Sequence, residues 1–145
     1  MEVSFAHLCD YATVSREGKL SVMGIFSRIS TGRLPSQHHQ AFLAFQLDAS
    51  SFELNRPFEV EIRCMGPDGE DLLKVEGKGM VGIKPGATVR PGDLHQFAQV
   101  VALKGLPLQR VGGHQIAIFL NGRLERTIRF DVALLGNPDE PSGTP

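Results

Sequence analysis

The sequence predicts an all-β protein, an antiparallel β-sandwich of about eight strands with immunoglobulin-like or jelly-roll-like topology. Apolar and polar residues alternate with period two in several segments, and turn residues punctuate the chain about every ten to fifteen positions. No segment shows the periodicity of an amphipathic helix. With 145 residues the chain is long enough for one domain, which we expect to cover residues 1–136.

Two hairpins are the clearest predicted elements. Residues 58–64 alternate apolar with charged side chains, and the Gly66-Pro67-Asp68-Gly69 turn that follows leads back into a strand at 72–76. The second hairpin joins strands at 114–120 and 127–132 through Asn121-Gly122, the dipeptide that type I′ turns prefer.

The other predicted strands cover 3–13, 20–29, 41–47 and 94–103. The glycine-rich segment 77–92 is typical of an edge strand that runs into a mobile loop. Residues 106–108 are expected to form an irregular connection. The Pro-rich tail 137–145 has no large apolar side chain after Gly136, so we expect it to be disordered.

Composition narrows the functional classes. Fifteen basic and sixteen acidic residues give a net charge of -1, which argues against a nucleic-acid partner. No apolar run approaches the length of a spanning helix and no secretory signal is visible at Met1, so we expect a cytoplasmic protein with no membrane partner. Cys9 and Cys64 are then expected to be buried thiols and not a disulfide.

Metal binding is the most concrete alternative chemistry. His7 and Cys9 share one face of a predicted strand, and His38 or His39 could supply a third ligand to zinc. Structural zinc sites usually have closely spaced ligand pairs at both ends, however, and adjacent histidines point apart in an extended chain. We therefore expect no metal and no cofactor, with a half-buried histidine beside a buried thiol.

Carboxylates and nucleophiles give weaker signals. The turn at residues 68–71 is acidic but does not match a calcium loop, and other carboxylates such as Asp48 or Asp93 would have to converge on it. Glu59 and Glu61 share a strand face, which is common on solvated sheets. No nucleophile-elbow motif is present, so no catalytic residue is assigned.

Charge is unevenly distributed along the chain. Acids dominate between Asp48 and Glu76, and bases dominate between Lys84 and Arg129. Two opposite patches could steer association, whereas neighbouring strands could instead interleave the two segments.

The order of several short motifs resembles a bacterial domain family of unknown function. These motifs are the LCDYA run at 8–12, the GKL run at 18–20, the GIF run at 24–26, a histidine before the 42–47 strand, and the last hairpin. The resemblance implies a small all-β sandwich with no assigned activity, so it carries over no catalytic residues. Gly113-His114 stands where an aromatic residue is more usual in this family, which affects the corner packing there.

The sequence therefore favours a non-catalytic sandwich that acts as a protein-interaction or self-assembly module in bacteria, with a protein partner or a homo-oligomer. The expected contact surfaces are the 77–92 edge or the 106–111 segment. Two alternatives stay open: a metal-binding protein or metalloenzyme using His7, Cys9 and His38 or His39, and a sandwich that binds an unknown small molecule.

Overall fold

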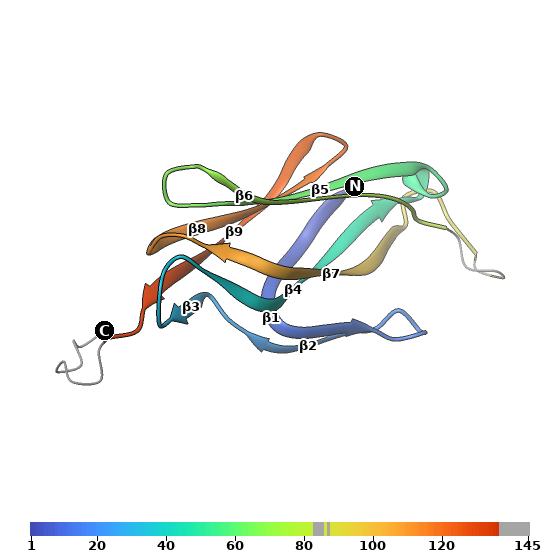
Figure 1. Cartoon of the computed structure of the whole chain (residues 1–145). Helices are drawn as coiled ribbons and strands as arrows, with labels where there is room; N and C mark the ends of the chain where they lie inside the picture. The colour runs from blue at the N-terminus through green and yellow to red at the C-terminus, as the bar shows by residue number, and fades with distance from the viewer. Residues whose placement is uncertain (83–85, 87, 137–145) are drawn as a thin grey trace.

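The computed structural model describes residues 1–82, 86 and 88–136, and the predicted tail at 137–145 lies outside this range. Nine strands and one short 3₁₀ helix make up the described fold (Figure 1). They are β1 (Glu2–Val14), β2 (Leu20–Ile25), β3 (Arg28–Thr31), β4 (Ser36–Ser50), η1 (Ser51–Glu53), β5 (Pro57–Met65), β6 (Asp71–Met80), β7 (Leu94–Leu108), β8 (Gly112–Leu120) and β9 (Arg123–Leu134).

The strands form two sheets. The four-stranded sheet has the order β2-β1-β4-β7, and the five-stranded sheet has the order β3-β9-β8-β5-β6. All neighbouring pairs are antiparallel except β3 with β9, which are parallel. The predicted all-β class is confirmed, with one parallel pair that the sequence did not indicate.

The predicted strand at 20–29 is two strands in different sheets. Gly24 has φ +68°, a conformation that side chains other than glycine rarely adopt, and the pairing of β2 with β1 ends at Ile25. The chain then crosses to the five-stranded sheet, where β3 pairs with β9. The prediction of one strand here was wrong. The residues at the crossing are similar in composition to the strands on either side, so the sequence pattern does not mark where the chain changes sheets.

The two predicted hairpins are confirmed. β5 pairs with β6 around the 66–69 turn, in which the Gly69 N–H donates to the Gly66 carbonyl at 3.0 Å. β8 pairs with β9 across Asn121 and Gly122, whose φ angles of 51° and 79° are those of a type I′ turn. Residues 106–108, predicted to be irregular, instead continue β7, where they pair with residues 36–38 of β4.

Side chains from both sheets contribute to one hydrophobic core. In β4 the odd-numbered residues Ala41, Leu43, Phe45 and Leu47 face this core and are at most 1% exposed. Their counterparts in the other sheet include Ile116, Ile118 and Leu120 of β8 and Phe130 of β9. The alternation at 58–64 predicted that Phe58, Ile62 and Cys64 face a core, and the structure places all three in it.

A second, smaller core lies on the opposite face of β4. Ala44 points away from the main core, yet it is fully buried, because Ala12 and Val22 of the β1–β2 hairpin pack into the same cluster together with Val100 of β7. Figure 1 shows β1 bending so that this hairpin runs beneath β4 and β7. The hairpin thus forms an additional layer over part of the four-stranded sheet.

His114 fills the corner where an aromatic residue was expected. Its side chain is 1% exposed, and its ring lies 5.0 Å from the ring of Phe130, its cross-strand partner. Nδ1 lies 2.9 Å from the Gly112 carbonyl, while Nε2 has no hydrogen-bond partner among the described residues. The imidazole therefore packs as an aromatic core side chain.

Candidate interaction surface

The four candidate zinc ligands do not converge. Cys9 is fully buried and its thiol lies 3.4 Å from the carbonyl of Phe42, which is opposite it in β4, while His7 on the same face is exposed. His38 and His39 lie four and three positions before Phe42 in β4, about 13 Å and 10 Å away by strand rise. The part of the chain that the structure describes contains no group of three or more His, Cys, Asp or Glu side chains that could hold a metal.

Both cysteines are buried free thiols. Burial raises the pKa of Cys64 to about 12. Burial and, secondarily, the nearby Asp10 carboxylate raise the pKa of Cys9. Because the thiolate is the reactive form, neither residue is suited to act as a nucleophile at neutral pH.

We expect both thiols to be unreactive toward Ellman's reagent in the native protein at pH 8, since a pKa of about 12 leaves roughly one thiolate in 10⁴ at Cys64. Two equivalents should react at once in denaturant. A fast stoichiometric reaction in buffer would contradict the buried placement of these residues.

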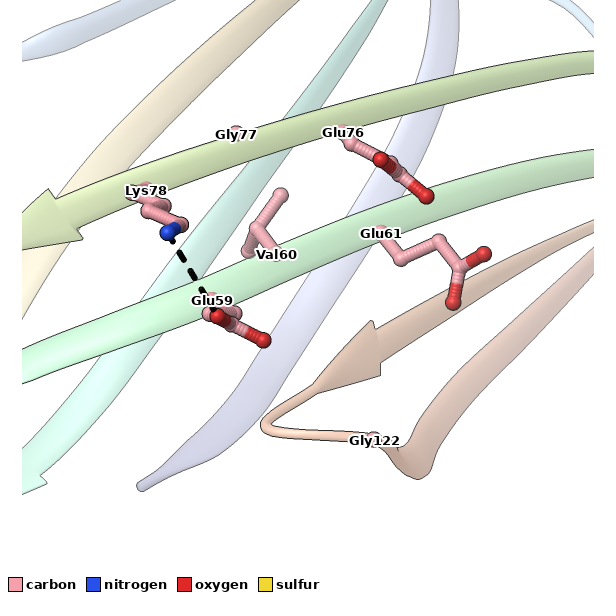
Figure 2. A pocket seen from close by; sticks show the side chains of 7 residues that line it. All are labelled: Glu59, Val60, Glu61, Glu76, Gly77, Lys78 and Gly122. Carbon is pink, nitrogen blue, oxygen red and sulfur yellow. Dashed lines mark ion pairs between the residues drawn. The ribbon is translucent and has the colours of Figure 1, made fainter.

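Glu59 and Glu61 lie on the outer face of the five-stranded sheet, beside a surface pocket of about 320 Å³ (Figure 2). Arg63 Nε donates to Glu61 Oε1 at 2.9 Å, and Lys74 Nζ lies 3.1 Å from the same oxygen. Lys74 also pairs with Glu76 at 2.9 Å. Glu61 and Glu76 thus belong to one network of ion pairs, whereas Glu59 pairs with Lys78 at 3.9 Å (Figure 2). This arrangement does not set one carboxyl apart as a proton donor and another as a base.

Hydrogen bonds from Arg63 and then Lys74 lower the pKa of Glu61 below its ordinary value of 4.5. A carboxylate with a lowered folded pKa stabilises the fold fully above its unfolded pKa, and this contribution is lost as pH falls through the folded value. We expect the urea concentration at the unfolding midpoint to decrease as the pH falls below about 4.5. This decrease with pH should be smaller in Glu61→Gln than in the wild-type protein, and intermediate in Lys74→Gln. The same pH dependence of the midpoint in all three proteins would show that this network does not contribute to the acid sensitivity of the fold.

The acidic turn after β5 is used by the hairpin itself. The Asp68 N–H donates to Glu70 Oε2 at 2.9 Å, and Asp68 forms an ion pair with Arg110. Asp48 and Asp93 lie near η1, which precedes β5, whereas this turn follows β5. The Asp68–Arg110 pair also connects the acid-rich segment to the base-rich one, through the β5–β6 turn and the β7–β8 connection.

The sheet edges differ in how well they are protected against pairing with another strand. β2 and β3 are short, and β6 carries the charged side chains of Asp71, Lys74, Glu76 and Lys78. The predicted edge character of residues 77–80 is therefore confirmed within β6. β7 differs, because it has 15 residues and only β4 as a hydrogen-bonded neighbour among the described residues.

The central part of the β7 edge has no protecting residue. From Leu94 to Leu103 it contains no Asp, Glu, Lys, Arg, Pro or Gly. Natural sheets usually place charges, prolines or bulges along an edge of this length to prevent pairing. Such a segment is suited to binding another extended strand through its backbone.

The core is also incompletely covered along β7. Leu43 and Leu47 of β4 are fully buried, whereas their cross-strand partners Val101 and Phe97 are only half-buried. Both half-buried side chains pack against the main core. A strand added beside β7 would therefore cover apolar surface in addition to pairing backbone groups.

Sequence reasoning placed the contact surface elsewhere. It named the 77–92 edge, of which residues 77–80 end β6, and the 106–111 segment. In the latter, Leu106 and Leu108 are buried in the main core, and Val111 is the large apolar residue that is exposed. The strand at 94–103 was predicted, but its edge position was not, because strand order does not follow from alternation. The feature of the sequence that could have indicated a contact surface here is the absence of charged residues from 94 to 103.

A second exposed apolar surface lies on the outer face of the β1–β2 hairpin. Tyr11, Met23 and Ile25 are 50%, 66% and 59% exposed. The ring of Tyr11 packs edge-on against that of Phe42, with the ring centroids 5.3 Å apart. The bend of β1 turns Tyr11 away from the main core. The Asp10 carboxylate lies close to Gly24 in this hairpin, and Ile25 borders a surface pocket together with His7 and Phe26.

Comparison with known proteins gives a family and no activity. A family model described as a family of unknown function (DUF6941) matches residues 4–133. No curated protein matches the chain. A solved structure of Pseudomonas fluorescens alkylpurine DNA glycosylase AlkC bound to DNA containing an abasic site analog is similar with a TM-score of 0.41 and 12% sequence identity, covering 88% of this chain and 30% of that one. Similarity at this level gives no information about DNA binding or catalysis here. The described residues include no helix long and apolar enough to cross a membrane.

Proposed function

Because this chain belongs to a family of unknown function, DUF6941, we propose its role from the surface it presents: it is a non-catalytic interaction module that binds through the free edge of β7. The observation that supports this most strongly is the edge strand β7, whose segment from Leu94 to Leu103 carries no Asp, Glu, Lys or Arg and whose core-facing side chains Phe97 and Val101 are half-buried. A partner strand would satisfy its unpaired backbone groups and cover Phe97 and Val101.

The other features of the chain fit a binding protein better than an enzyme. The thiols have raised pKa values, and the ion-paired Glu61 has a lowered one, so neither type of group is poised for proton transfer near pH 7. Two free buried thiols also suit the reducing bacterial cytoplasm, where we place the protein.

Site-specific photo-crosslinking tests the proposal. The photoreactive residue p-benzoylphenylalanine would replace Gln96 on β7 and, as a matched control, Thr127 on the exposed outer face of β9. Irradiation of cells that naturally produce the protein should give a discrete adduct from position 96 and none from position 127. Mass spectrometry of the adduct identifies what occupies the edge. Equal, diffuse labelling at both positions, or no adduct at either, would contradict an interaction at β7.

A further inference from the structure

We infer that the strand bound at the β7 edge is β7 of a second copy of this chain, in an antiparallel, two-fold symmetric dimer. This inference rests on the proposed use of the edge and adds the identity and geometry of its occupant. The evidence is that the charges and the half-buried side chains of β7 match those of a second, antiparallel copy of β7.

The two ends of the uncharged segment carry opposite charges. Asp93 immediately precedes β7, and Lys104 follows Leu103, the last residue of the uncharged segment 94–103. Antiparallel pairing of two copies places the Asp93 end of one strand beside the Lys104 end of the other, at both ends of the interface. Parallel pairing in register would instead place like charges together, so the charges favour the antiparallel arrangement.

The symmetry axis can be placed within the strand. A two-fold axis through an antiparallel pair puts one residue opposite its own copy, and Gln99 lies at the centre between Asp93 and Lys104 to within one residue. With Gln99 on the axis, Lys104 lies opposite Leu94 of the second copy. Lys104 is then displaced by about 3.4 Å along the strand from Asp93 of that copy.

The same register matches the side chains that the monomer leaves half-buried. Phe97 and Val101 face the main core, and each lies two residues from Gln99. In the dimer Phe97 of one copy is opposite Val101 of the other, so the two cores become continuous across the axis. The two Gln99 amides lie opposite each other, where each can donate to and accept from its copy.

The resulting assembly is closed. Pairing joins the two four-stranded sheets into one eight-stranded sheet, with β7 and its copy at the centre. Because the contact uses the same surface on both copies, it ends at two chains and does not propagate into a fibre. The remaining edges are the short β2 strands, which is the protected arrangement that natural sheets favour.

Disulfide trapping tests the register directly. Gln99→Cys places two thiols opposite each other on the axis, within the distance at which a disulfide forms. Gln96→Cys is the matched control, because the two thiols would then lie about 20 Å apart along the strand. Cys9 and Cys64 are buried, so the introduced thiol is the accessible one.

Mild oxidation of Gln99→Cys should convert most of the protein to a covalent dimer with twice the 15.8 kDa chain mass. Gln96→Cys should remain monomeric on the same non-reducing gel. Equal crosslinking of the two variants, or none in either, would overturn the inference, and circular dichroism checks that both variants keep the native fold.

A charge exchange provides an independent test that leaves the centre of the strand intact. Lys104→Glu should weaken dimerisation about tenfold in sedimentation experiments, because it places two acids together at each end. Adding Asp93→Lys to the same chain should restore the dimer. If the double variant stays as weak as the single one, the assigned pairing is wrong.

The outcomes separate this inference from the proposed function. If the wild-type chain is monomeric at all concentrations but position 96 crosslinks to a different protein, the edge is an interaction site and its occupant is not a second copy. If position 96 gives no adduct and the chain is monomeric, both the function and the dimer are wrong.

Discussion

Phe45→Ala should lower the free energy of unfolding by about 4 kcal/mol. Phe45 lies in the central strand β4, is 1% exposed, and faces the core shared by both sheets. Truncation to alanine removes the apolar contacts of the ring and leaves a cavity that surrounding strands, fixed by their hydrogen bonds, can fill only in part.

Urea unfolding of purified protein measures this change. The matched control is Phe52→Ala, which makes the same truncation at a side chain that is 70% exposed on η1, and it should change stability by less than about 0.5 kcal/mol. Similar losses in the two variants would mean that Phe45 does not occupy the core position described above.

Ala44→Glu should destabilise the protein by about 3 kcal/mol or more, although the wild-type side chain is a single methyl group. Ala44 is fully buried between β4 and the folded-back β1–β2 hairpin, where the cluster contains only apolar residues and the Cys9 thiol. A carboxylate there has Val100 and the exposed His7 as its cross-strand neighbours, so it must either be buried or displace the hairpin from the sheet.

Thiol labelling and unfolding together report on this variant. Displacement of the hairpin would expose Cys9, so one of the two thiols should react with Ellman's reagent in native buffer while Cys64 stays protected. Thr13→Glu introduces the same charge on the exposed side of the hairpin and should leave both stability and labelling unchanged. A stable, unlabelled Ala44→Glu protein would show that the second core does not exist in solution.

The parts of the fold that depend on local chemistry could be predicted from the sequence. Alternation gave the inward residues of β5, and Asn121-Gly122 gave the β8–β9 turn, because side-chain direction and turn type are set within a few residues. Strand order could not be predicted, since it depends on which distant segments pair. For the same reason the crossing after Ile25, with β2 in one sheet and β3 in the other, was missed.

The candidate surface was partly visible in the sequence. The strand at 94–103 was predicted, and its lack of charged residues can be read directly from the chain. Its role as an edge became apparent only when β4 was found on one side of it and no strand on the other among the described residues. His7 and Cys9 illustrate the opposite case, because they share a strand face as predicted but differ in burial, and the histidines of β4 lie too far along the strand to join them.

Hydrogen–deuterium exchange at two protein concentrations measures whether a second copy covers the β7 edge. Amides that point away from β4 in the segment from Leu94 to Leu103 have no partner strand among the residues that the structure describes, and they should exchange rapidly in dilute solution. At concentrations that favour association they should become protected, while the charged edge at β6 keeps its exchange rate. Exchange along β7 that is rapid and identical at both concentrations, with every sample monomeric by mass, would contradict self-pairing at this edge.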